Sequence, residues 1–137
     1  MKETLKPGLE LTRRIIVDRE RTIDFMGEDG RVYGTPHLVR DIEETCREIM
    51  LAHGDAGEDS VGIHVDVSHS APTLLGMWVE LTVKVTEVNG RRVVFQVVGR
   101  DAVDEICRGA HQRAAVNVAT LLERLKAKAG TAPVAAA

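Results

Sequence analysis

Three side chains of this sequence could together do acid–base chemistry. His69 carries an imidazole, which titrates near neutral pH and can act as a general base. Thr35 supplies a hydroxyl and Glu43 a carboxylate; a carboxylate beside an imidazole fixes its tautomer and stabilises its charged form. Each residue also has a structural interpretation, as a helix cap, a solvated helix carboxylate or a core histidine. The choice depends on the elements that position them.

A central helix is predicted from about Pro36 to His53. Thr35 and Pro36 are typical of a helix start, a capping hydroxyl followed by proline at the first helical position, and Gly54 provides a stop. An apolar stripe recurs at helical spacing, whereas Asp41 and other charged residues lie away from it; the stripe consists of Leu38, Val39, Ile42, Cys46, Ile49 and Met50. Glu43 lies on the shoulder of the stripe, where a carboxylate is either half-exposed or faces a pocket.

Strand patterns account for most of the remaining chain. In one strand from about Ser60, Ile63 and His69 share an inward phase with the valines between them. Asn89-Gly90 is a strong hairpin signal between two further strands. The other predicted segments are strands at 9–17, 79–86, 91–101 and 105–118, a polar mobile loop at 19–34, a short helix around 121–125, and a flexible tail at 127–137.

This element order predicts an α+β fold, an antiparallel sheet wrapped around one long helix, in a single domain spanning residues 1–137. A sheet covered by one helix leaves surface to bury. We therefore expect a homodimer, with a dimer of dimers as a further option.

Composition excludes several classes of protein. Hydrophobic residues make up 44% of the chain and charged residues 28%, which is typical of a globular protein rather than a disordered or membrane protein. The net charge is −3 and no basic run is present, so nucleic-acid binding is not expected. Residues 1–10 lack the apolar region of a signal peptide, and a cytoplasmic location is expected.

Metal and nucleotide chemistry are also not expected. The five histidines show no ligand spacing, and no paired cysteines support them; they are His37, His53, His64, His69 and His111. Cys46 and Cys107 are interpreted as small buried residues. The sequence contains no glycine-rich phosphate loop after a strand and no GxSxG motif.

Three runs of sequence resemble a known family. They are GIHVDVSHSAPTLLG from Gly62, VNGRR from Val88, and DEICRGAHQR ending at Arg113. These runs resemble the fluoroacetyl-CoA thioesterase family, without gaps from Thr35 to Arg113. The resemblance implies a hot-dog fold, hydrolysis of a small acyl-CoA to the free acid and CoA, and no cofactor beyond the CoA of the substrate.

The resemblance also implies roles for particular residues. Thr35, Glu43 and His69 occupy the catalytic positions, and Gly62, His69 and Arg113 occupy substrate-binding positions. The fluoroacetyl-specific member closes its pocket with aromatic residues before the helix, whereas residues 27–32 here read GEDGRV. The sequence therefore predicts no aromatic lid and a looser selection among acyl groups.

Two other functions remain open. One is a hot-dog hydratase or dehydratase, which needs an acid and a base on either side of the α and β carbons. The other is a non-catalytic acyl-CoA-binding or regulatory domain. The residues favour hydrolysis, because thioester hydrolysis needs a base near neutrality, an attacking hydroxyl or water, and donors for the oxyanion.

Overall fold

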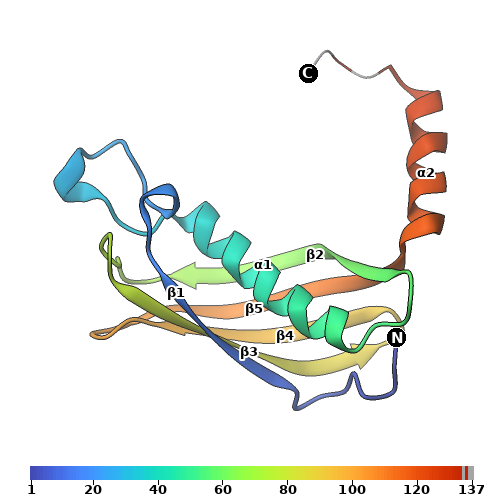
Figure 1. Ribbon diagram of the computed structural model, residues 1–137, viewed down its shortest axis with the longest axis horizontal. Coiled ribbons are helices and arrows are strands. Elements are labelled where there is room, and N and C mark those ends of the chain that lie inside the picture. Colours follow the sequence, from blue (N-terminus) through green and yellow to red (C-terminus); the bar gives the residue numbers. More distant parts are fainter. Residues whose placement is uncertain (134, 136–137) are drawn as a thin grey trace.

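The computed structural model describes residues 1–133 and 135, which form one antiparallel sheet and two α-helices (Figure 1). The elements are β1 (Glu10–Ile16), 3₁₀ turns at Arg19–Arg21 and Glu28–Gly30, α1 (Thr35–Ala52), β2 (Glu58–His69), β3 (Trp78–Asn89), β4 (Arg92–Arg100), β5 (Glu105–Asn117) and α2 (Val118–Thr131). The strand order is β1-β3-β4-β5-β2, and α1 lies across one face of the sheet. The α+β prediction is confirmed.

The core lies between α1 and the middle of the sheet. In β3, Val79, Leu81, Val83 and Val85 are fully buried and alternate with more exposed residues, as predicted for a half-buried strand. The helix stripe packs on them through Leu38, Ile42, Cys46, Ile49 and Met50. The predicted hairpin joins β3 to β4, and Gly90 adopts φ 61°, a value that glycine tolerates without strain.

β2 contains a bulge that changes which of its residues face the helix. Its pairing with β5 shifts between Gly62 and His64. The prediction that Ile63 shares the inward phase of His69 is therefore wrong, since Ile63 is 50% exposed. Gly62 faces inward instead, because a Cβ built on it would point at the carboxylate of Glu43.

β2 is also an edge of the sheet, since it pairs with β5 and has no other neighbour among the described strands (Figure 1). Three of its apolar residues are exposed: Val61, Ile63 and Val65. An exposed edge with apolar side chains is a surface that proteins normally cover.

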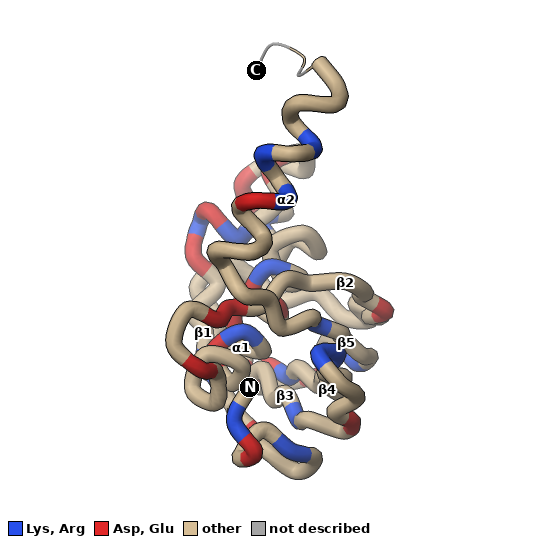
Figure 2. Tube along the Cα trace, turned by 90° about the vertical axis from the view of Figure 1, so that its right-hand side faces the viewer, with Lys and Arg blue, Asp and Glu red and all other residues tan. Residues whose placement is uncertain are grey.

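The second helix is longer than predicted. α2 continues to Thr131, into the segment expected to be a flexible tail, of which residues 134, 136 and 137 lie outside the described part of the chain. It stands away from the sheet (Figure 1), and it carries one acidic residue, Glu123, followed by three basic residues, Arg124, Lys126 and Lys128 (Figure 2). No helix of the described residues has the length and hydropathy needed to cross a membrane.

Candidate active site

Thr35 and His69 meet at the N-terminal end of α1. The Thr35 hydroxyl lies 2.8 Å from Nδ1 of His69, which is the last residue of β2. The helix starts where predicted, with Pro36 in its first turn, but Gly34 is the N-cap and no side chain caps the helix. The predicted capping role of Thr35 is therefore wrong. Its hydroxyl is engaged by the imidazole instead.

The environment of His69 favours a neutral imidazole. Burial lowers the pKa of His69 below its ordinary value, because a charged ring loses hydration there. Its Nε2 is buried and has no hydrogen-bond partner among the described residues. The ring of Tyr33 packs edge-on against the imidazole, with centroids 6.2 Å apart and planes at 78°. A neutral imidazole with one free nitrogen can accept a proton.

A cavity of about 320 Å³ opens beside this contact. Its lining is mostly apolar and consists of Ile23, Phe25, Val32, Tyr33, Thr35, His69, Ser70, Ala71 and Pro72. Phe25 is an aromatic residue in this lining and precedes the polar run at 27–32, but it is 77% exposed, so the absence of an aromatic lid stays a prediction. The N–H of Ile23 donates to the carbonyl of Val32 at 3.0 Å, so the chain folds back on itself here. Residues from both sides of this turn, Ile23 and Val32, therefore line the cavity.

Arg113 is buried under β2 and connects it to β5. Its guanidinium donates to the hydroxyl and the carbonyl of Ser60, each at 2.8 Å, and it is 5% exposed. His111 Nδ1 donates to the carbonyl of His64, so its Nε2, 3.2 Å from Arg113 Nη1, accepts from the arginine. Burial lowers the pKa of both His111 and Arg113. In the single chain Arg113 thus has a structural role, and its contact with substrate stays a prediction.

Glu43 lies beside this buried group rather than beside His69. A Cβ at position 62 would stand 2.5 Å from Glu43 Oε1 and 3.2 Å from His111 Cε1, so only glycine leaves room for the carboxylate. Gly62 and His69 are seven residues apart on an extended strand, a separation of about 20 Å. Thr35 and Glu43 are eight residues apart on a helix, about 12 Å. The structure brings Thr35 and His69 together, but it places Glu43 of the same chain elsewhere.

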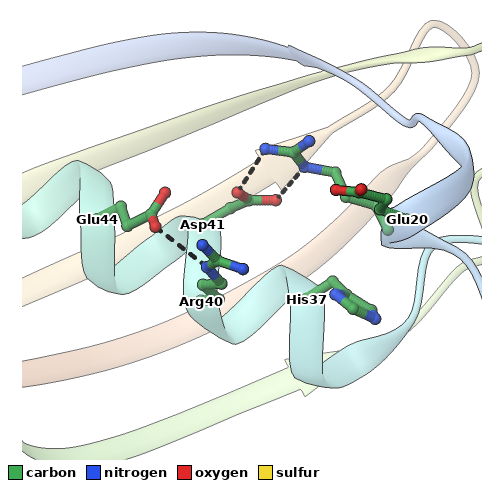
Figure 3. A pocket seen from close by; sticks show the side chains of 6 residues that line it. Glu20, His37, Arg40, Asp41 and Glu44 are labelled. Carbon is green, nitrogen blue, oxygen red and sulfur yellow. Dashed lines mark hydrogen bonds and ion pairs between the residues drawn. The ribbon is translucent and has the colours of Figure 1, made fainter.

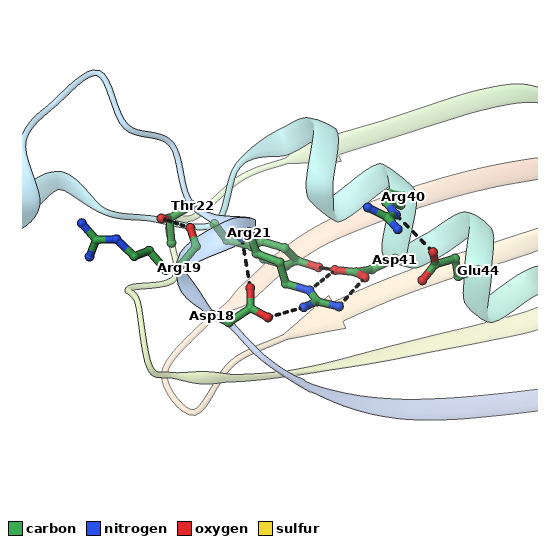
Figure 4. A network of polar contacts seen from close by, with 8 residues as sticks. Asp18, Arg19, Arg21, Thr22, Arg40, Asp41 and Glu44 are labelled. Atoms are coloured by element: carbon green, nitrogen blue, oxygen red, sulfur yellow. Dashed lines mark hydrogen bonds and ion pairs between the residues drawn. The ribbon is translucent and has the colours of Figure 1, made fainter.

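The sequence interpretation missed a buried network next to the cavity. Asp41, predicted to lie on the polar face, is 2% exposed. It accepts hydrogen bonds from Arg21 Nε and Nη2 at 2.9 and 3.0 Å and from the hydroxyl of Tyr33 (Figure 4). Its spacing from Leu38, three residues earlier on the buried stripe, was the signal that its position is half-inward.

A second cavity, of about 280 Å³, lies on the other side of this network (Figure 3). Its lining is charged and consists of Glu20, Arg21, His37, Arg40, Asp41 and Glu44. Arg40 and Glu44 pair across one turn of α1 at 3.1 Å. No three His, Cys, Asp or Glu side chains within residues 1–133 and 135 are grouped as metal ligands.

Comparisons with known proteins point to one family. Residues 17–119 match the family model described as fluoroacetyl-CoA-specific thioesterase. The chain is 31% identical to the fluoroacetyl-CoA thioesterase of Streptantibioticus cattleyicolor, covering 93% of this chain and 94% of that protein. A solved structure of the fluoroacetyl-CoA thioesterase FlK superposes with TM-score 0.82 at 27% identity, covering 90% of this chain and 97% of FlK.

The fold also recurs in a more distant protein. A hot-dog-like protein from Thermanaerovibrio acidaminovorans has TM-score 0.82 at 24% identity, covering 89% of this chain and 91% of that one. The sheet with its single central helix is therefore a hot-dog fold, as the sequence resemblance implied.

Proposed function

Since the chain belongs to the fluoroacetyl-CoA-specific thioesterase family, we infer that it hydrolyses an acyl-CoA to a free acid and coenzyme A. The observation that carries this is the 2.8 Å contact between Thr35 Oγ1 and His69 Nδ1 at the mouth of an apolar cavity. It joins a neutral base to a hydroxyl at a place where a small acyl group fits.

In the reaction that we propose, the acyl group enters the cavity and its thioester carbonyl lies beside Thr35. His69 takes a proton from the attacking oxygen, the carbonyl carbon becomes tetrahedral, and the C–S bond then breaks. The thiolate of CoA leaves and takes up the proton from His69. Thr35 is also the first residue of α1, so the positive end of the helix dipole would stabilise the oxyanion.

Two routes fit this contact. If His69 Nδ1 accepts the proton of Thr35, the hydroxyl itself attacks and an acyl-enzyme forms, which water then hydrolyses. If Nδ1–H donates to Thr35, Nε2 accepts the proton of an attacking water and the hydroxyl only positions the ring. Mass spectrometry of enzyme quenched during turnover distinguishes them, because only the first route adds an acyl mass to the chain.

We propose that the active protein is a homodimer and that Glu43 acts across the dimer interface. β2 is an exposed edge with apolar side chains, and antiparallel pairing of two β2 strands would cover it. A two-fold axis crossing β2 midway between Gly62 and His69 would place Glu43 of each chain near His69 of the partner subunit. There the carboxylate would orient the imidazole and stabilise its protonated form.

Mixing two inactive variants tests the shared site. A His69→Ala chain retains Glu43, and a Glu43→Ala chain retains His69, so a mixed dimer contains one complete site. Random re-pairing makes half of the dimers mixed, so activity should return to about one quarter of the native value. No recovery in demonstrably mixed dimers would place both residues in one subunit and reject the shared site.

The substrate that we propose is a small acyl-CoA, chosen with modest selectivity. The cavity holds about 320 Å³, and Phe25 at its mouth is 77% exposed, so it does not form a rigid cover. One methylene in an apolar pocket is worth about 1–3 kcal/mol, and related acyl groups should differ by roughly 10–200-fold in kcat/KM. The measurement is CoA release from acetyl-, fluoroacetyl-, butyryl- and phenylacetyl-CoA.

The same experiment separates the remaining functions. Native enzyme should release CoA, and His69→Ala should lower kcat by roughly 100-fold or more while KM changes little. Binding of acyl-CoA without release would identify a regulatory domain, and hydration of an enoyl-CoA without release would identify a hydratase. A His69→Ala variant that is folded and fully active would reject the proposed base.

A further inference from the structure

A single buried carboxylate holds both ends of the segment that lines the cavity. We name residues 17–34 the cover segment, since Ile23, Phe25 and Val32 within it line the cavity. Arg21 near its start and Tyr33 near its end both donate hydrogen bonds to Asp41 of α1. Figure 4 shows Arg21 reaching Asp41 and, on its outer side, Asp18.

Each group in this network depends on the others for its hydrogen bonds. The Asp41 side chain is 3% exposed, so its charge is compensated by the two guanidinium bonds of Arg21 rather than by water. Burial and the neighbouring carboxylate raise the pKa of Tyr33, which therefore stays protonated and donates to Asp41. An apolar residue at position 41 would leave a buried hydroxyl without an acceptor, which favours movement of the Tyr33 ring.

The ring of Tyr33 connects the hydrogen bonds of Asp41 to the imidazole of His69. Its backbone N–H donates to the carbonyl of Thr73 at 2.8 Å, and its hydroxyl is held by Asp41, so both ends of the residue are fixed. Between them the ring packs edge-on against His69 at 6.2 Å between centroids. The imidazole is thus held by the Thr35 hydroxyl on one side and by this ring on another.

We propose that Asp41 is a positioning residue for His69, acting through the hydroxyl and ring of Tyr33, and that with Arg21 it keeps the cover segment over the cavity. The inference rests on the proposed role of His69 as the base. It extends the site to a residue that touches neither substrate nor imidazole. Its effect is on the orientation of the base and therefore on kcat more than on KM.

The test compares kinetics of Asp41→Leu with those of Glu44→Leu. Both variants remove one carboxylate from the same charged cavity and the same helix, but Glu44 pairs with Arg40 and is not bonded to Tyr33 (Figure 3). A misplacement near 1 Å costs up to about 100-fold, so Asp41→Leu should lower kcat by roughly 10–100-fold per folded enzyme, with KM changed less than about threefold. Glu44→Leu should leave both parameters unchanged.

A second substitution tests the route through Tyr33. Adding Tyr33→Phe to Asp41→Leu removes the unpaired hydroxyl and keeps the ring, so kcat should rise again by about 10-fold. Adding Tyr33→Leu instead removes the ring, and kcat should not recover. If Asp41→Leu alone does not fold, the comparison of these two double variants carries the test.

Three results would overturn the inference. They are native kcat in folded Asp41→Leu, equal loss in Glu44→Leu, and equal kcat in the two double variants. The His69→Ala variant is measured in the same assay. If it stays active, the proposed function fails as well; if it is inactive while Asp41→Leu is active, only the positioning role of Asp41 fails.

Discussion

Adding one methyl group at position 62 should lower kcat while changing the stability of the fold little. In Gly62→Ala the new Cβ would lie 2.5 Å from Glu43 Oε1, whereas ordinary contact begins at 3.4 Å, so the oxygen must move by about 0.9 Å (3.4 minus 2.5). The atom that must move furthest is the end of a flexible side chain, whereas the buried His111 ring, 3.2 Å from the new Cβ, must give by only a few tenths of an ångström. These displacements should therefore cost less than the roughly 1–3 kcal/mol of overpacking in a rigid core.

The expected effect on turnover is larger. Displacing a group that orients the base by about 1 Å costs up to about 100-fold. We expect kcat to fall by about 10–100-fold, a barrier increase of about 1.4–2.7 kcal/mol. The assay is CoA release from a short acyl-CoA, with thermal unfolding of the same preparation to show that the melting temperature changes little.

Two controls make the result specific. Gly130→Ala adds a methyl group where no atom lies within 4 Å, and it should leave kcat unchanged. Gly62→Ala made in a Glu43→Ala background has no carboxylate to displace, so it should add little to the loss caused by Glu43→Ala alone. Native kcat in Gly62→Ala, or the same loss in both backgrounds, would refute a catalytic role for the Glu43 carboxylate.

Four further outcomes are expected. Thr35→Ala should lower kcat by roughly 100-fold, and Thr35→Ser by less than about 10-fold. Because Thr35 makes no capping bond, Thr35→Ala should lower the free energy of unfolding by less than the roughly 1 kcal/mol that loss of a helix cap costs, as measured by thermal unfolding. His69 and His111 have pKa values lowered from 6.5 by burial, so the unfolded chain binds more protons; the free energy of unfolding should be full above pH 6.5 and fall below it, as measured by thermal unfolding across pH. Ile63→Lys places a charge on the exposed edge of β2 and should give inactive monomers in sedimentation, whereas active monomers would contradict the shared site. Phe25→Ala widens the cavity mouth and should raise kcat/KM for phenylacetyl-CoA relative to acetyl-CoA by up to about 200-fold; an unchanged ratio would remove Phe25 from acyl selection.

Much of the architecture was predictable because it depends on short-range patterns. The alternation around Leu81, the Asn89-Gly90 turn and the proline at the start of α1 each act within a few residues, and the structure contains all three. The motif around His69 likewise identified the family. None of these signals requires knowledge of which strands become neighbours.

The site itself depended on contacts between distant segments. Phe25 reaches the cavity because the cover segment folds back on itself, and Asp41 is buried because Arg21 and Tyr33 converge on it. A helical pattern records where a side chain points but not which charged partner arrives there. For that reason, the sequence interpretation placed Asp41 away from the buried stripe and did not identify Phe25 as a residue of the pocket.

The sequence alone determined the order of the elements, the helix stripe, the hairpin and the family, since these follow from local periodicity and from a contiguous motif. Tertiary structure decided that the Thr35 hydroxyl meets His69 rather than capping its helix. It also decided, through a bulge in β2, that Gly62 faces inward beside Glu43 and far from His69 of the same chain. A bulge arises from how two strands share their hydrogen bonds, and strict alternation within one strand cannot reveal it.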